Sequence, residues 1–328
     1  MKETRTVEPE PYPPERHRAP IIRSRIMLQI ASHLVGQPDW AERQVMVQLR
    51  RQGENDFRFS LLGGDSPKSI ADVVEGRIDI AIVNPATAAS AGLHHAGLDG
   101  GALAAIATIP SYDQLGIAVR ADTGVTRLED LPEVKPSLRL ALRPQQDHAV
   151  QGFIRDALAA VGVTLDDIVA WGGALLPDPS LPREPSLVLS GDADAVADEG
   201  VYNWGSSVLQ RGMRLLSFGE DTLTRLESWG YRRGLLTPHR FPELDDAVST
   251  LDFSGFLLYT RAGAPDQLVE SFCAALLAER DNIAWQGGTS LPLERMVADA
   301  IDAPLAVPLH PAAARFWASH GMLGDASV

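Results

Sequence analysis

Short apolar runs alternate with helix-like stretches along most of the chain. From residue 57 onward, runs such as FRFSLL, RIDIAIV and ALAAIATI are bounded by turn residues, a pattern that predicts strands. KSIADVVEG and ATAASAG, which lie between such runs, predict short helices. The same rhythm returns with the strand LRLAL and a helix over 147–161. Strand–helix–strand units of this length predict parallel strands joined by right-handed crossovers.

The two ends of the chain differ from this rhythm. Isoleucine and leucine residues spaced four apart predict a helix over 21–36, whereas 39–51 fits either a helix or a strand. Further helices are expected over 265–280, 290–300 and 311–320.

Together these elements predict an α/β protein of two lobes with a central ligand cleft. We expect a flexible tail over 1–20, a first lobe formed by 21–120 together with about 250–328, and a second lobe over about 121–249. The first crossing between the lobes should fall near 119–125. Ligands of open α/β sheets bind beyond the carboxyl ends of the strands, so function is expected at the strand-to-helix turns.

Composition excludes several classes of function. The 328 residues carry 29 Lys and Arg against 43 Asp and Glu, a net charge of −14, which disfavours nucleic-acid binding because that depends on basic side chains. No apolar stretch approaches the roughly 18 residues of a membrane span, so no membrane insertion is expected. The single cysteine, Cys273, excludes an internal disulfide and a Cys-rich zinc site, and its apolar surroundings predict a buried thiol.

The first twenty residues bear on location. They read MKETRTVEPEPYPPERHRAP and lack the apolar core of a secretory signal. We therefore expect a cytoplasmic protein as the sequence stands, and a periplasmic one if a signal peptide was removed.

The turn after FRFSLL is the first candidate site. Gly63 and Gly64 allow close backbone approach, and the N–H groups of Gly64, Asp65 and Ser66 at a helix start would bind an anion, with Lys68 adding charge. The alternative is an ordinary tight turn with Ser66 as the helix cap.

The turns NPAT and PSYDQ supply the second candidate set. Asn84 follows a strand, where its amide can donate to and accept from a ligand, or can cap the helix that comes next. Ser111 and Tyr112 lie between two strands and are expected to face the cleft.

The turn RPQQDH is the third candidate site. Arg143 could hold a carboxylate through a bidentate fork, with Gln145, Gln146 and His148 nearby. The alternatives are a surface ion pair for Arg143 and a hydrogen-bonded structural role for His148.

Asp198 and Glu199 end another strand, and together with Tyr202, which follows closely, they could line the ligand cleft. Paired carboxylates suit acid–base chemistry, although an acidic helix N-terminus is the simpler explanation. The adjacent His94 and His95 lack a third ligand, so no metal site is expected, and no motif calls for a cofactor.

Five segments, in order, carry a family resemblance. They are GGDSPKSIADVVEGRIDIAIVNPATAASAG, VRADTGVTRLEDLPE, LVLSGDADAVADEG, MRLLSF and VPLHPAAARFWASHGM, and they span about 55–322. They resemble the type II periplasmic-binding-protein superfamily, and more closely the TAXI solute receptors of tripartite ATP-independent periplasmic (TRAP) transporters. The chain departs from that family in its first strand and Gly-rich turn, which are replaced by the tail and the helix over 21–36.

The resemblance implies a two-lobed clamp that closes on a small organic anion such as a carboxylate, with TRAP membrane subunits as partners if the chain is exported. Carried over by position, the ligand contacts are Gly64, Asp65 and Ser66, then Asn84, then 143–148. The rival hypothesis is a cytoplasmic enzyme on this scaffold, such as a decarboxylase of an aromatic or other carboxylate. In that case Arg143 would anchor the substrate, and His148 or the pair Asp198 and Glu199 would be the acid–base groups.

Overall fold

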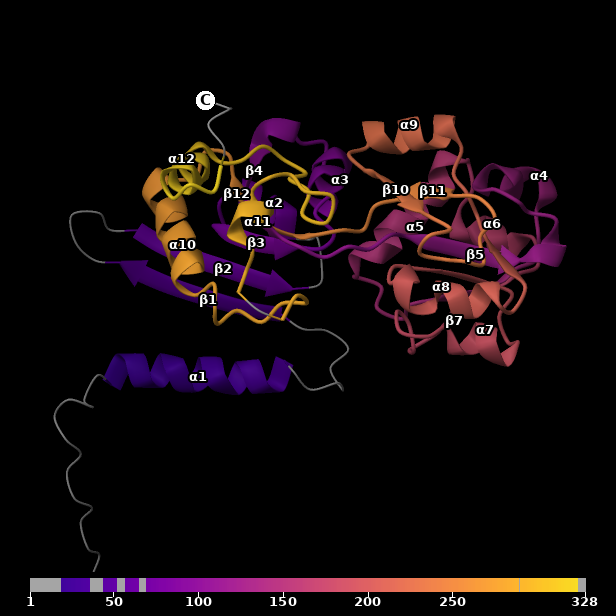
Figure 1. Ribbon diagram of the computed structural model, residues 1–328, viewed down its shortest axis with the longest axis horizontal. Helices are drawn as coiled ribbons and strands as arrows, with labels where there is room; N and C mark the ends of the chain where they lie inside the picture. The colour runs from indigo at the N-terminus through magenta and orange to yellow at the C-terminus, as the bar shows by residue number, and fades with distance from the viewer. Residues whose placement is uncertain (1–18, 36–43, 52–56, 65–68, 289, 324–328) are drawn as a thin grey trace, which may run out of the picture.

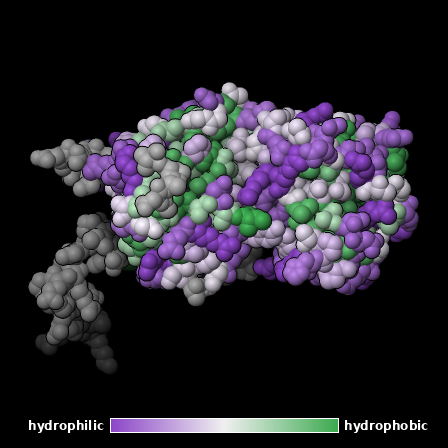
Figure 2. All heavy atoms as spheres, turned by 45° about the horizontal axis from the view of Figure 1, so that its top comes forward, coloured by the Kyte–Doolittle hydropathy of each residue, from purple (hydrophilic) through white to green (hydrophobic). Residues whose placement is uncertain are grey.

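The computed structural model describes residues 19–35, 44–51, 57–64, 69–288 and 290–323, arranged as two α/β lobes side by side (Figure 1). Residues 1–18 of the predicted tail and the predicted ligand residues Asp65, Ser66 and Lys68 lie outside the described residues, whereas residues 19 and 20 of that tail belong to the first helix. On the face in Figure 2, hydrophilic residues cover most of both lobes, and hydrophobic residues form smaller patches among them.

The first lobe is built on a five-stranded sheet with the order β1-β2-β3-β12-β4. β1 is antiparallel to β2, β2 is parallel to β3, and β12 is antiparallel to both of its neighbours. The central strands are nearly continuous apolar runs because helices cover both faces of the sheet. The strand bounds are Gln44–Arg51 (β1), Phe57–Gly64 (β2), Ile80–Val83 (β3), Leu103–Ile109 (β4) and Phe256–Arg261 (β12).

The second lobe has a five-stranded sheet with the order β7-β6-β8-β5-β9. β6 is parallel to β7 and β8, as the strand–helix rhythm predicts, whereas β5 is antiparallel to β8 and β9. A separate two-stranded sheet pairs β10 with β11. The bounds are Gly116–Arg120 (β5), Arg139–Leu142 (β6), Ala174–Pro177 (β7), Ala195–Asp198 (β8), Met213–Leu215 (β9), Arg233–Leu236 (β10) and Val248–Leu251 (β11).

Each sheet receives one antiparallel strand from the chain that crosses between the lobes. β5 pairs in the second sheet directly after β4 in the first, so the chain crosses over 110–115. This corrects the crossing expected near 119–125. The chain returns between β11 and β12, over 252–255. The result is a two-lobed α/β fold, which agrees with the fold class that the sequence resemblance implies.

Helices cover both faces of each sheet because successive strand residues point to opposite sides. In the first lobe α2 and α3 cover one face, and α10 to α12 cover the other. In the second lobe α5 covers one face, and α7 and α8 cover the other. The α-helix bounds are Ala19–Val35 (α1), Ser69–Val74 (α2), Ala88–His95 (α3), Leu131–Val134 (α4), Ala149–Ala160 (α5), Leu165–Ala170 (α6), Ser186–Ser190 (α7), Val201–Leu209 (α8), Glu220–Ser228 (α9), Asp266–Ala278 (α10), Leu293–Met296 (α11) and Pro311–Ser319 (α12).

Several local predictions can now be judged. The helix over 21–36 is confirmed as α1, and the ambiguous stretch 39–51 contains β1. The helix over 290–300 is shorter than expected, because Pro292 precedes its first residue in a non-helical conformation and Val297 (φ −119°) ends it. Cys273 is fully buried on α10, where burial raises the pKa of its thiol to about 12. No helix in the described part of the chain is long and apolar enough to cross a membrane.

Candidate functional site

A cavity of about 470 Å³ lies between the two lobes, at the ends of their strands. The first lobe contributes the residues that end β2 and β3 and begin β12, and the second contributes the start of α5 and the end of β8. Crevices at this position in open α/β sheets are the usual ligand sites. The lining residues are Val35, Val45, Gly63, Gly64, Ile82, Val83, Asn84, His148, Glu199 and Phe256.

The glycine turn forms one wall of this cavity. Gly63 and Gly64 are the last residues of β2 and both line the space. A Cβ atom at Gly63 would lie 3.9 Å from Ile82 Cγ2, an ordinary van der Waals distance, so the position has room for a side-chain atom. The predicted approach of a ligand to bare backbone therefore fits the geometry at Gly64 and extends to Gly63.

Asn84 forms the adjacent part of the same wall. Its Nδ2 donates to the backbone carbonyl of Gly255 at 3.0 Å, which ties the end of β3 to the returning crossover. The alternative role as a helix cap is wrong, because Thr87 occupies the N-cap position of α3. One amide proton and the side-chain carbonyl thus remain for a ligand.

Arg143 does not direct free guanidinium N–H groups into the cleft. Its Nη2 donates to Asp198 Oδ1 at 2.8 Å and to Glu199 Oε1 at 2.5 Å, and its Nη1 lies 2.9 Å from His148 Nε2. Asp198 is fully buried and Arg143 is 7% exposed. The predicted ligand anchor is corrected to a buried ion pair, because the two carboxylates already occupy most of the guanidinium donors.

His148 lines the cavity in its neutral form. Its Nδ1 accepts the backbone N–H of Val150, which caps α5, as the structural alternative predicts. Burial and the neighbouring Arg143 guanidinium lower the pKa of the imidazole to about 3. A ring held neutral over the physiological range is a hydrogen-bonding group, and it is a weak proton acceptor for catalysis.

Asp198 and Glu199 occupy different environments. Burial raises the pKa of Asp198 to about 7, while Arg143 acts in the opposite direction. Asp198 is sealed from the cavity and cannot touch a ligand, which removes it from the acid–base pair expected of an enzyme. Glu199 does line the cavity, so it brings a carboxylate to the wall opposite Gly63 and Asn84.

Asp113, which the sequence interpretation missed, supports the turn that carries Glu199. It lies in the first crossover, where its Oδ2 accepts the backbone N–H of Gly200 at 2.7 Å, beside Glu199. Its own backbone carbonyl accepts the N–H of Phe253 in the second crossover. Burial, and next the charge of Glu199, raise the pKa of Asp113 to about 8. The turn PSYDQ contains this residue, but only its interlobe contacts distinguish Asp113 from its neighbours.

Four predicted ligand residues lie away from the cavity. Ser111 donates to Gln286 Oε1 at 3.2 Å, and Gln146 is exposed and accepts from Arg155. Tyr112 packs against Tyr202, with ring centroids 5.5 Å apart. Tyr112 lines a different cavity of about 460 Å³, near β10 and β11, so the expected position of these side chains in the central cleft is wrong.

Two remaining predictions concern Gln145 and the histidine pair. Gln145 is half-buried beside the cleft but does not line the cavity. His95 Nε2 lies 2.6 Å from Asp156 Oδ2, a contact from α3 to α5 across the lobes, and His94 stacks on Trp229. No group of three or more metal-ligating side chains occurs within the described ranges.

No known protein family and no curated protein matches the sequence. Among solved structures, XAC2383 from Xanthomonas citri, bound to chloride ion, is 18% identical over 79% of this chain and 81% of that chain, with a TM-score of 0.40. The substrate-binding protein of an amino acid ABC transporter is 13% identical over 71% and 86%, with a TM-score of 0.28. The ATP phosphoribosyltransferase (HisG:HisZ) complex of Thermotoga maritima is 11% identical over 79% and 94%, with a TM-score of 0.34. At such identities a neighbour's ligand says nothing of the ligand here, which has to be inferred from this chain's own residues.

Proposed function

We propose that this protein is a solute receptor whose two lobes close on a small organic acid, with no catalytic step. The observation that carries the proposal is the cavity of about 470 Å³ with walls from both lobes. Closure of the lobes would surround a ligand there, and the volume is in the usual range for small-molecule sites.

The composition of the walls fits a ligand with an apolar body and a polar end. Val45, Ile82, Val83 and Phe256 supply apolar surface. A ligand carboxylate would bind the first-lobe wall, where the Asn84 amide and the glycine-turn backbone lie. Few, well-placed polar groups in an apolar pocket are typical of binding sites.

The cavity-lining residues of the second lobe restrict the chemical class of the ligand further. Glu199 and the neutral His148 face the same space, and a carboxylate there repels a second anionic group. We therefore expect a monocarboxylate whose other end carries a hydrogen-bond donor, a hydroxyl or an ammonium, directed at Glu199. Dicarboxylates should bind more weakly.

The ordered sequence blocks extend the proposal to a TAXI-type receptor. Its partners would then be TRAP membrane subunits, and it would act in the periplasm if the chain is exported. These finer assignments are supported by the sequence resemblance alone.

Replacing Gly63 by valine should block the cavity. Gly63 has no left-handed backbone angle and ends a strand, so valine is compatible with its conformation. The added side chain would project into the space that a ligand needs. Overpacking of this kind costs about 1–3 kcal/mol, and about 1.4 kcal/mol is tenfold in affinity. We expect calorimetry with a panel of small mono- and dicarboxylates to show binding to the wild type and a loss of about tenfold or more in Gly63→Val.

Gly263→Val is the matched control, since Gly263 lies in an exposed turn of the same lobe with open space around it. The control should bind like the wild type. A ligand that binds Gly63→Val and the wild type equally would place the site elsewhere, and a panel without any binder would contradict the proposed ligand class.

A further inference from the structure

The cavity of about 460 Å³ near β10 and β11 lies beside the two crossovers that connect the lobes. Gln114 from the first crossover and Asp252 from the second both line it, and the first lobe contributes Ile301. The residues that line this cavity are all different from those that line the cavity between the lobes. It is therefore a separate space, and its volume is in the usual range for small-molecule sites.

Asp252 gives this cavity an acceptor that is not fully used. Its side chain is 3% exposed, and its Oδ1 accepts from Gln114 Nε2 at 3.0 Å and from the Ser254 hydroxyl at 2.6 Å. Its Oδ2 is buried and accepts no hydrogen bond from the described residues. Arg232 Nη1 lies 3.6 Å from Oδ2, which is an ion pair beyond hydrogen-bond distance. Buried carboxylate oxygens are normally hydrogen-bonded, so Oδ2 is suited to a donor from a ligand.

Arg232 places donors next to that acceptor. Its Nη1 makes two long contacts, at 3.6 Å to Asp252 Oδ2 and at 3.5 Å to the backbone carbonyl of Ile301. Both contacts use Nη1, so the described residues leave Nε and Nη2 for a ligand. The Arg232 side chain is 37% exposed, which lets the guanidinium adjust its position when a ligand enters.

The charges that line the cavity balance, because Arg232 and Arg233 face Asp252 and Glu220. Arg233 and Glu220 satisfy each other through two hydrogen bonds of 2.8 and 2.7 Å. Asp252 and Arg232 are then the acidic and the basic group that meet a ligand, which favours a ligand without net charge. Apolar side chains supply further wall, namely Phe218, Leu223, Leu235 and Ile301.

We propose that this cavity binds a zwitterionic α-amino acid with an apolar side chain, as a second ligand besides the solute bound between the lobes. The ligand ammonium would donate to Asp252 Oδ2 in place of the distant Arg232 Nη1, and the ligand carboxylate would accept from the Arg232 guanidinium. Burial raises the pKa of Asp252, and a bound ammonium would act in the opposite direction and favour the carboxylate.

Calorimetry with folded Gly63→Val protein, at about 0.15 M salt, tests the proposal. That substitution is expected to block the cavity between the lobes, so binding would report the second cavity. The probes are L-leucine and two analogues with the same apolar body, 4-methylpentanoate without the ammonium and 3-methylbutylamine without the carboxylate. Leucine should bind, and each analogue should bind about tenfold more weakly or worse, because one charge-assisted interaction is lost.

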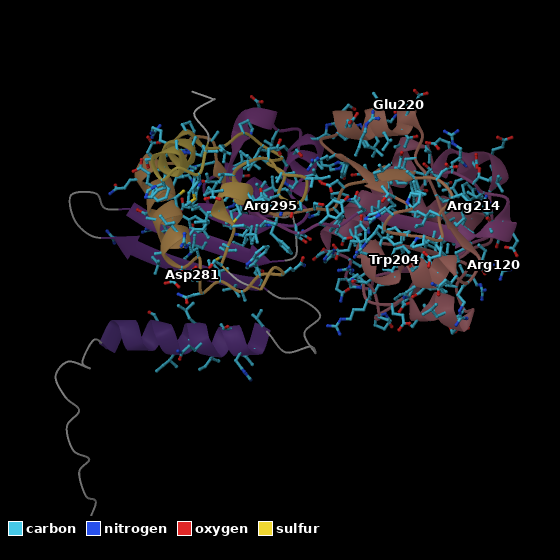
Figure 3. The ribbon with its side chains drawn as sticks, in the orientation of Figure 1. Arg120, Trp204, Arg214, Glu220, Asp281 and Arg295 are labelled. Atoms are coloured by element: carbon cyan, nitrogen blue, oxygen red, sulfur yellow. The ribbon has the colours of Figure 1, made fainter. Side chains whose placement is uncertain are left out.

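Variants of Arg232 supply a second readout in the wild-type and Gly63→Val backgrounds. Arg232→Gln should weaken leucine binding to this cavity about tenfold, and Arg232→Lys, which keeps the charge without the planar fork, should lose less. Leucine should raise the melting temperature of Gly63→Val and should not raise that of Gly63→Val with Arg232→Gln. The matched control is Arg214→Gln, an exposed strand arginine of the second lobe (Figure 3), which should bind like its parent.

Three results would each overturn the proposal. Leucine does not bind folded Gly63→Val, or either analogue binds as tightly as leucine, or Arg232→Gln and Arg214→Gln bind leucine equally. The solute between the lobes is tested separately, by its loss of binding in Gly63→Val, so one site can fail without the other.

Discussion

Arg143→Ala is expected to lower the free energy of unfolding by about 3–5 kcal/mol at pH 8, the usual loss when one partner of a buried ion pair is removed. Asp198 is fully buried, and Arg143 is the one cation that bonds it among the described residues. Without the guanidinium, the folded protein must either bury an unpaired charge or protonate Asp198. Urea unfolding followed by circular dichroism measures the effect.

The difference in the free energy of unfolding between the wild type and Arg143→Ala should become smaller as the pH falls. The pKa of Asp198 is about 7 in the folded protein and about 3.9 in an unfolded chain. A carboxyl group with a raised folded-state pKa favours folding below the unfolded value, and that contribution is lost as the pH rises through the folded value. Removing Arg143 raises the folded-state pKa further, so the variant should approach the wild type near pH 5.

Asp198→Asn in the Arg143→Ala background is the control. The amide carries no charge, so the double variant should recover much of the lost stability at pH 8 and lose the pH dependence. Equal deficits at pH 5 and pH 8, or no recovery in the double variant, would contradict the buried-charge explanation.

Trp204→Ala should lower the free energy of unfolding by about 3–5 kcal/mol, the usual loss when a large aromatic side chain is removed from a core. Trp204 is fully buried on α8, in the second lobe (Figure 3), and its Nε1 donates to the backbone carbonyl of Glu199 at 2.8 Å. It also fills the space above Gly116, where a Cβ atom would lie 2.6 Å from the indole ring. The variant would therefore lose core packing and the support of the Glu199 turn.

Trp171→Ala is the comparison for this prediction, because Trp171 is only partly buried. Trp171→Ala should lower the free energy of unfolding by clearly less than Trp204→Ala does, when both are measured by urea unfolding. Trp204→Phe should fall between the two, since it keeps most of the packing and loses the hydrogen bond. Similar costs for Trp171→Ala and Trp204→Ala would show that Trp204 does not support the turn as described.

The sequence predicted most of the strands, because they are short apolar runs bounded by turn residues, but it did not predict β7 or β10. It could not place β5, since the segment between β4 and β5 is short enough to be read as a connection within one lobe. Which sheet a strand joins is decided by pairing with distant segments, here β8 and β9. The first crossing was therefore expected too late in the chain.

The candidate site was predicted in part for a related reason. Gly64 ends a strand, and Asn84 and His148 lie in turns that come after strands, so local pattern is sufficient to find these positions. Whether the Arg143 guanidinium is available to a ligand depends on carboxylates 55 and 56 residues away, and no local sequence pattern reveals those contacts. Phe256 and Asp113 were missed because their roles arise only where the crossovers meet the lobes.

Small-angle X-ray scattering, with and without a saturating carboxylate, tests the central claim that the lobes close on a ligand. We predict a smaller radius of gyration in the bound state, because a ligand that contacts Asn84 on one lobe and Glu199 on the other draws the lobes together. The ligand used should be one whose binding Gly63→Val weakens. An unchanged radius at saturation with that ligand would contradict closure.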